Sequence, residues 1–199
     1  FVGDYDSYVS TIIAETGRAR QETVVMEVFP ACDCLNWFSK RAAKMLADES
    51  VSLHLVRQKS AKVVYKPMGV VGVISPWNGP FILALNPTVQ ALLAGNAVIV
   101  KPSEITPFCG MLVDRLFKAA GLPEGVCQVL LGDGETGAAL IEGGIDKISF
   151  TGSVATGRKV GEAAGRNLVP CSLELGGKDP MLVCADADLE RAAGGALFG

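Results

Sequence analysis

Ile148-Ser-Phe-Thr-Gly-Ser-Val-Ala-Thr-Gly157 is the stretch of sequence that decides the fold. Its first residues predict a buried strand over 147–150, and a helix is expected over 153–164. Between them, Gly152 lets the backbone approach a pyrophosphate, Ser153 can donate its hydroxyl, and the helix N-terminus supplies free N–H groups. An ordinary glycine-rich turn with Ser153 as the N-cap is the alternative, and the stretch by itself leaves both open.

Strands and helices are expected to alternate on both sides of this stretch. The patterns predict strands over 62–65, 70–74, 97–100, 126–131, 171–175 and 181–183. They predict helices over 8–14, 21–29, 31–47, 88–94, 106–120 and 135–141, and a last one from near Asp186. Pro30 should kink or restart the helix around it. This order predicts an α/β fold: a doubly wound, mostly parallel, Rossmann-like sheet with helices on both faces, preceded by an N-terminal helical segment.

The composition excludes several classes of partner. Hydrophobic residues make up 49% of the 199 residues, enough for a packed core, and the net charge of −3 gives no basic surface for nucleic acid or an anionic membrane. Residues 68–100 carry no charge, but proline and asparagine interrupt every apolar run before the roughly 20 residues of a membrane span. We therefore expect neither nucleic acid nor membrane as a partner.

Cysteine usage and the N-terminus bear on location and metals. The six cysteines lack the paired spacing of a zinc site, and His54 is the one histidine, so no metal site is expected. Reduced thiols fit a cytoplasmic protein best. The chain begins at Phe1 without the basic and apolar regions of a secretory signal, and resembles the middle of something longer.

Lys101-Pro-Ser-Glu104 directly follows the predicted strand over 97–100. Ligand-binding groups gather at the carboxyl ends of parallel strands, where Lys101 and Glu104 can both reach ribose hydroxyls. The acidic residue precedes the glycine loop here, so the pattern is a variant of the usual dinucleotide fingerprint. A solvated surface turn is the alternative.

Two further residues suit carbonyl chemistry. Glu174 ends an apolar strand, and apolar surroundings would raise its pKa toward that of a general base. A buried glutamate paired with Lys178 is the alternative. Asn78 follows the strand over 70–74, and its amide could stabilise an oxyanion, although Asn78-Gly79 is also a common turn pair.

Taken together, four motifs resemble the aldehyde dehydrogenase superfamily: Ser75-Pro-Trp-Asn78, Lys101-Pro-Ser-Glu104, Phe150-Thr-Gly-Ser153 with Gly157, and Glu174-Leu-Gly-Gly-Lys178. The resemblance implies that Asn78 helps form an oxyanion hole, that Glu174 activates water, and that Lys178 lies near the nicotinamide. The cofactor-binding residues it implies are Ile74, Ser75, Pro76, Trp77, Lys101, Ser103, Glu104, Gly132, Phe150, Thr151, Gly152, Ser153, Thr156, Gly157, Leu175 and Gly176. NAD is the expected cofactor because Glu104 would repel a 2′-phosphate. The neighbouring Lys101 could soften that repulsion, so NADP is the alternative.

The implied reaction is oxidation of an aldehyde to a carboxylic acid through a thiohemiacetal and a thioester, with hydride passing to the nicotinamide. The family's nucleophilic cysteine lies on a later segment, and none of the six cysteines here matches it, so we expect this chain to be inactive alone. A non-catalytic dinucleotide-binding or structural protein is the alternative function. A related reductase of acyl phosphates or acyl-CoA is disfavoured because Glu174 serves thioester hydrolysis.

The same resemblance divides the chain into three parts. Residues 1–53 would be N-terminal helices of the cofactor domain, 54–67 the first part of an oligomerisation arm, and 68–199 the dinucleotide-binding domain. The catalytic domain would be absent. The full-length protein is expected to be a homodimer or homotetramer.

Overall fold

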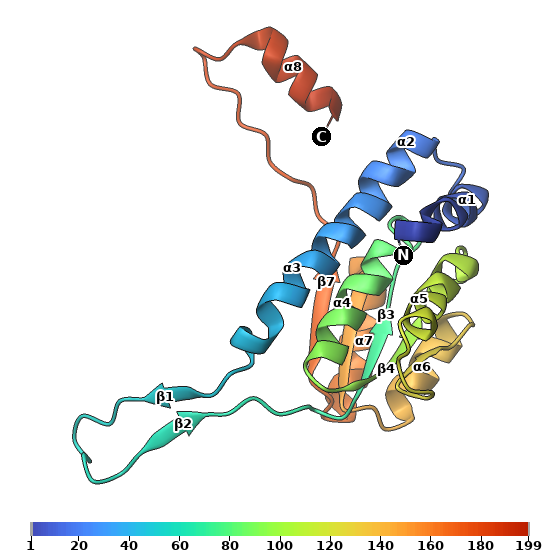
Figure 1. The fold of residues 1–199 in the computed structure, drawn as a ribbon. Coiled ribbons are helices and arrows are strands. Elements are labelled where there is room, and N and C mark those ends of the chain that lie inside the picture. The colour runs from blue at the N-terminus through green and yellow to red at the C-terminus, as the bar shows by residue number, and fades with distance from the viewer. Residues whose placement is uncertain (1, 199) are drawn as a thin grey trace.

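A computed structural model of the chain describes residues 2–198. Its centre is a five-stranded sheet in the order β5-β4-β3-β6-β7. Every neighbouring pair in this sheet is parallel. The strands are β3 (Val70–Ile74), β4 (Ala97–Lys101), β5 (Cys127–Val129), β6 (Lys147–Gly152) and β7 (Cys171–Leu175). The predicted α/β, parallel, Rossmann-like fold is confirmed, and Figure 1 shows its helices packed around the sheet.

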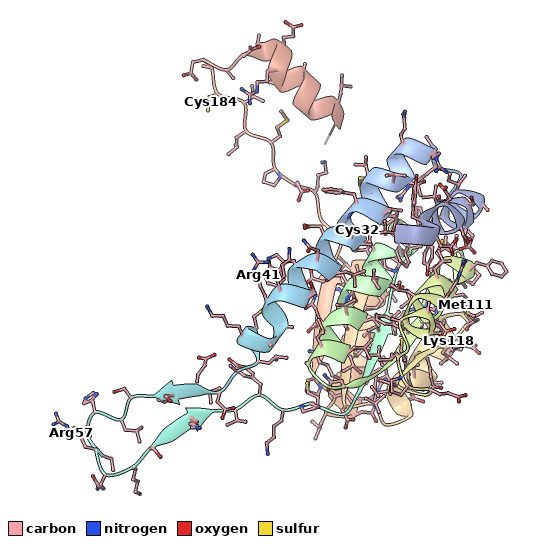
Figure 2. The ribbon with its side chains drawn as sticks, in the orientation of Figure 1. Cys32, Arg41, Arg57, Met111, Lys118 and Cys184 are labelled. Atoms are coloured by element: carbon pink, nitrogen blue, oxygen red, sulfur yellow. The ribbon has the colours of Figure 1, made fainter. Side chains whose placement is uncertain are left out.

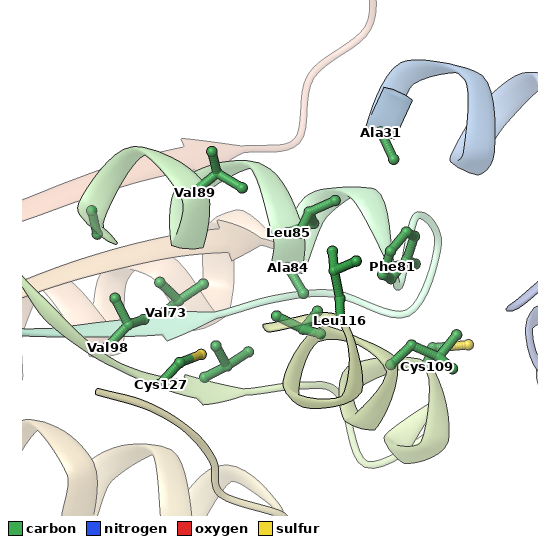
Figure 3. Close-up of a cluster of buried hydrophobic side chains, with 14 of the residues drawn as sticks. Ala31, Val73, Phe81, Ala84, Leu85, Val89, Val98, Cys109, Leu116 and Cys127 are labelled. Carbon is green, nitrogen blue, oxygen red and sulfur yellow. The ribbon is translucent and has the colours of Figure 1, made fainter. Parts of the chain in front are cut away.

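Alternating side chains of the central strands enter two separate cores, as the period of two in a strand requires. Val71 and Val73 of β3 lie in a cluster with α4 (Ile82–Leu93) and α5 (Pro107–Ala119) on one face, part of which Figure 3 shows. Val70 and Ile74 pack on the other face, against α6 (Gly134–Glu142) and α7 (Val154–Arg166). Helices therefore cover both faces, and the doubly wound arrangement follows from the pattern.

The N-terminal helical segment packs on the first of these faces. It consists of a 3-10 turn η1 (Val2–Asp4), α1 (Tyr5–Thr16), α2 (Arg20–Thr23), a π-helical turn η2 (Val24–Val28) and α3 (Phe29–Met45). Pro30 stands at the start of α3, directly after the π turn, where the Phe29 amide bonds the Val24 carbonyl. Proline cannot donate the regular helical hydrogen bond, so the expected interruption occurs here as a π turn.

Helix α4 begins six residues before the predicted start at Thr88, and that prediction was wrong. Pro87 lies inside the helix, and a proline in the interior of a segment normally argues against a helix there. The helix is anchored by tertiary contact instead of local sequence. Glu27 Oε2 accepts hydrogen bonds from the Phe81 and Ile82 amides at 3.2 and 2.8 Å, which satisfies N–H groups that the helix end leaves free.

Two segments extend away from the sheet (Figure 1). Strands β1 (Glu49–Val51) and β2 (Ala61–Val63) pair antiparallel in a hairpin. Strand β2 overlaps the strand predicted over 62–65, whereas β1 was not predicted and lies within the 1–53 part that was expected to be helical. At the other end, an irregular segment leads from β7 to α8 (Leu189–Phe198), which starts just after Asp188 rather than near Asp186. No helix among residues 2–198 is long and apolar enough to cross a membrane.

The strand predicted over 181–183 does not form, and that prediction was wrong. Leu182 is 90% exposed there. A short apolar run lacks the length to specify a pairing partner, and the sheet of the described chain ends at β7.

Candidate functional site

The predicted motifs meet at one edge of the sheet. In the register of the strands, Ile74 is the Cα partner of both Lys101 and Phe150, and Thr151 is the partner of Glu174. The ends of β4, β3, β6 and β7 therefore present their following residues side by side. The chain continues from β3 to α4 on one face and from β6 to α7 on the other, and ligands of doubly wound sheets bind in such a crevice.

Ser153 caps the start of α7, as predicted if the stretch is an ordinary glycine-rich turn with Ser153 as the N-cap. Its hydroxyl accepts from the Thr156 amide at 3.2 Å and lies 3.1 Å from the Thr156 hydroxyl. It also lines a pocket, so capping the helix and facing a ligand are compatible roles here.

Close packing against Leu175 explains why residue 157 is a glycine. A Cβ built on Gly157 would lie 2.4 Å from Leu175 Cδ2, closer than real contacts allow. The glycine lets α7 lie directly against the end of β7, which fixes the helix N-terminus over the sheet edge.

A pocket of about 480 Å³ lies between α6 and α7 above this edge, and we call it the α6–α7 pocket. Twelve of the predicted cofactor residues line it: Ile74, Ser75, Pro76, Trp77, Lys101, Ser103, Glu104, Phe150, Thr151, Gly152, Ser153 and Thr156. The sequence had no motif for the others, which are Asp133, Gly134, Gly137, Ala138, Ile141, Lys159, Val160 and Ala163. These recur every three or four residues along α6 and α7, so helical periodicity could have indicated them.

Lys101 is buried in this pocket, only 4% exposed, which contradicts the surface-turn alternative for that residue. Its Nζ donates to the Pro102 carbonyl at 3.0 Å and to Glu104 Oε2 at 3.4 Å. Ser75 Oγ, also in the pocket lining, is buried without a hydrogen-bond partner among the residues described. A buried hydroxyl with unused hydrogen-bonding capacity suits a polar ligand.

A wider pocket of about 1200 Å³ opens on the opposite face of β6 and β7, and we call it the open-face pocket. Asn78, Glu174, Leu175 and Gly176 line it. It shares five residues with the α6–α7 pocket: Pro76, Trp77, Thr151, Gly152 and Ser153. The two pockets therefore meet at the loops that follow β3 and β6, which is where a cofactor in one could contact a substrate in the other.

Glu174 is exposed, so the predicted apolar surroundings were wrong. The reason is topological: β7 is the edge strand of the described sheet, and its alternate side chains face the open pocket. No ion pair joins Glu174 to Lys178 within the described part of the chain, which leaves the paired-glutamate alternative without support.

Three predicted residues line neither pocket. Gly132 precedes α6 with a φ of +154°, and a Cβ there would lie 2.0 Å from the Thr136 hydroxyl. Gly157 is buried against Leu175, and Lys178 lies on the irregular segment after β7. Their assignment to cofactor or catalysis stays a prediction.

None of the six cysteines, all of which lie within the described residues, lines either pocket. Burial raises the pKa of Cys109 well above its usual range and that of Cys127 to about 11, so both thiols stay protonated near neutrality. Cys34 donates to Asn86 Oδ1 at 3.3 Å, and Cys184 lies on the segment leading to α8, away from the sheet (Figure 2). Residues 2–198 also hold no cluster of three or more acidic, cysteine or histidine side chains able to bind a metal.

A model of the aldehyde dehydrogenase family matches residues 4–199. The chain belongs to this family. It is 47% identical over 196 residues to 4,4'-diapolycopene aldehyde oxidase of a Methylomonas species, covering 98% of this chain and 37% of that protein. A Mycolicibacterium smegmatis protein named as a candidate NADP-dependent succinate-semialdehyde dehydrogenase is 44% identical over 184 residues, covering 90% of this chain and 35% of its own.

Solved aldehyde dehydrogenases have the same fold. The Mycobacterium tuberculosis enzyme complexed with NAD⁺ superposes with a TM-score of 0.88 and 37% identity, over 95% of this chain and 39% of its own. An NAD-dependent aldehyde dehydrogenase of Sinorhizobium meliloti gives a TM-score of 0.92 and 32% identity, over 100% of this chain and 39% of its own. The chain thus spans well under half of the length of these relatives.

Proposed function

We propose that this chain is the cofactor-binding part of an enzyme that oxidises an aldehyde to a carboxylic acid with NAD or NADP as the oxidant. The observation that carries the proposal is the meeting of two pockets at the loops after β3 and β6. A dinucleotide in the α6–α7 pocket would reach the shared residues from one side and an aldehyde would reach them from the other.

The residues present fit a dinucleotide. The buried, unpartnered Ser75 hydroxyl and the N-terminus of α7 offer hydrogen-bond donors to phosphate oxygens, and Ser153 and Thr156 add hydroxyls beside them. Lys101 and Glu104 would hold ribose hydroxyls. A bound NAD or NADP supplies a hydride acceptor, and the solved relative from Mycobacterium tuberculosis is complexed with NAD⁺.

The preference between NAD and NADP depends on charge. The Glu104 carboxylate would repel a 2′-phosphate, which favours NAD. Lys101 already offsets part of that charge at 3.4 Å, and Lys159 adds a further cation to the pocket lining. We propose NAD as the principal cofactor with NADP accepted, and a comparison of turnover with the two dinucleotides tests this order.

Within the open-face pocket, Asn78 and Glu174 have the chemistry that aldehyde oxidation needs. The Asn78 amide would donate to the oxygen of the attacked carbonyl, and the exposed Glu174 carboxylate would take a proton from the water that hydrolyses the thioester. The nucleophilic thiol would come from a later segment of the full-length protein. We also propose that Lys178 lies near the nicotinamide in the full-length enzyme.

The remaining assignments are proposals of the same kind. Residues 54–67, within and after the exposed β1–β2 hairpin, would be the first part of an oligomerisation arm between the helices of 1–53 and the domain of 68–199. The exposed apolar side chains Leu55 and Val64 suit a surface that another subunit covers. A cytoplasmic homodimer or homotetramer is the assembly we propose.

Aldehyde-dependent reduction of NAD by the full-length protein tests the proposal. Asn78→Ala should lower kcat on the order of 100-fold or more by removing an oxyanion donor. Glu174→Gln should lower kcat, since the acyl-enzyme then accumulates, while NAD affinity stays near that of the unmodified protein. Binding of NAD without any aldehyde-dependent reduction would instead support the non-catalytic dinucleotide-binding alternative.

A further inference from the structure

Arg18 and Glu27 link the N-terminal helices to the loop that carries Asn78. Arg18 Nη1 pairs with Glu27 Oε1 at 3.0 Å, and Arg18 Nη2 donates to the Asn78 main-chain carbonyl. The Glu27 side chain is fully buried and that of Arg18 is 20% exposed. One guanidinium therefore touches both the buried carboxylate and the loop, across 60 residues of sequence.

Glu27 holds the far end of the same loop. Its second oxygen accepts from the Phe81 and Ile82 amides, at the point where α4 begins. The segment from Asn78 to Ile82 is thus held by the carbonyl at one end and by two amides at the other. The two clamping side chains are paired with each other, so neither end can move without disturbing the second.

The orientation of an oxyanion donor is sensitive to such support, because a displacement of about 1 Å can cost on the order of 100-fold in rate. Asn78 itself is exposed and lines the open-face pocket, and among residues 2–198 the one hydrogen bond between its main chain and another element comes from Arg18. Local sequence alone gives the Asn78-Gly79 turn no rigid orientation.

We propose that Arg18 is a positioning residue for Asn78. Its hydrogen bond to the Asn78 main-chain carbonyl orients the oxyanion-stabilising amide, and its ion pair with Glu27 holds the Arg18 side chain in place. This inference rests on the proposed oxyanion role of Asn78. It requires the planar fork of arginine, because a single ammonium group cannot bond Glu27 and the Asn78 carbonyl with the same geometry.

The test is a double-mutant cycle in the full-length enzyme, with Arg18→Lys and Asn78→Ala. Arg18→Lys keeps a cation beside Glu27, so the thermal unfolding midpoint should change little. The variant loses the hydrogen bond to the Asn78 carbonyl, so kcat should fall about tenfold. The Kd for NAD should stay unchanged, because Arg18 does not line the α6–α7 pocket. In the Asn78→Ala background, Arg18→Lys should cost no further activity, since the amide it orients is gone.

Arg20→Lys is the matched control. Arg20 lies in the same segment and pairs with Asp6 at the surface, so the substitution Arg20→Lys should leave kcat and stability unchanged. Full kcat in Arg18→Lys, or a tenfold loss that persists undiminished on top of Asn78→Ala, would overturn the positioning role while leaving the proposed function intact. Normal kcat in Asn78→Ala alone would overturn the oxyanion role and the inference together.

Discussion

Glu27 Oε2 accepts a hydrogen bond from the Ile82 amide at 2.8 Å, although 55 residues separate the two in sequence. Glu15 does the same for α5, accepting from the Phe108 and Cys109 amides at 3.0 and 2.6 Å. Two carboxylates of the N-terminal segment therefore cap the two helices that cover one face of the sheet. The N-terminal segment is in this way joined to the helices that cover the sheet.

Truncation of Glu27 should be strongly destabilising. Glu27→Ala removes the buried partner of the partly buried Arg18 and leaves two amides unsatisfied, which should lower the free energy of unfolding by about 3 kcal/mol. Glu22→Ala is the control, because Glu22 also faces Arg18, at 3.6 Å, but is 55% exposed and should cost less than about 1 kcal/mol. Urea unfolding measures both, and equal losses would show that burial of the Glu27 pair is unimportant.

The stability of the fold should also depend on pH through Glu27. Burial raises the pKa of this carboxyl, while the bonds from Ile82 and Phe81 and the charge of Arg18 lower it by less. The folded protein therefore binds the proton more tightly than the unfolded one. The resulting stabilisation is complete below the ordinary pKa of 4.5 and is lost as pH rises through the folded pKa.

Glu27→Gln isolates this effect because it removes the titration and leaves Arg18 in place. The free energy of unfolding of the unmodified protein, minus that of Glu27→Gln, should decrease as pH rises above about 4.5 and then level off. Urea unfolding across pH 4–8 provides the measurement. A difference that grows with pH would mean that the pKa of Glu27 is lowered in the fold.

Gly157 sets the distance between α7 and β7. Gly157→Ala puts a methyl 2.4 Å from Leu175 Cδ2, so Leu175 or the helix must move, at a cost of about 1–3 kcal/mol in stability and with weaker NAD binding. Gly161→Ala, one turn further on, meets Leu173 Cδ1 at an ordinary 3.5 Å and should be neutral or stabilising by up to about 1 kcal/mol. Thermal unfolding and NAD titration of the two variants check this, and an equal response would refute the packing role.

Local patterns were sufficient for the five parallel strands, and most of the residues proposed for the site lie together at one edge of that sheet. The β-branched runs of β3 and β4 and the glycine turn before α7 carry their own conformational preference, so their positions follow from the sequence. The start of α4 does not follow from the local sequence. Pro87 argues against a helix at this position, and the carboxylate that caps the helix belongs to the distant Glu27. Exposure of Glu174 was also beyond local reasoning, since an apolar strand can lie at the centre or at the edge of a sheet.

NAD titration of the full-length protein by calorimetry tests the central claim, that the α6–α7 pocket holds the dinucleotide. Gly137 lines this pocket beside Ile74 and Lys101, and Gly137→Leu would fill it, whereas Gly165→Leu, on α7, meets open space. The account predicts that Gly137→Leu weakens NAD binding at least tenfold, about 1.4 kcal/mol, while Gly165→Leu leaves it unchanged. Undiminished NAD binding by a folded Gly137→Leu protein would contradict it.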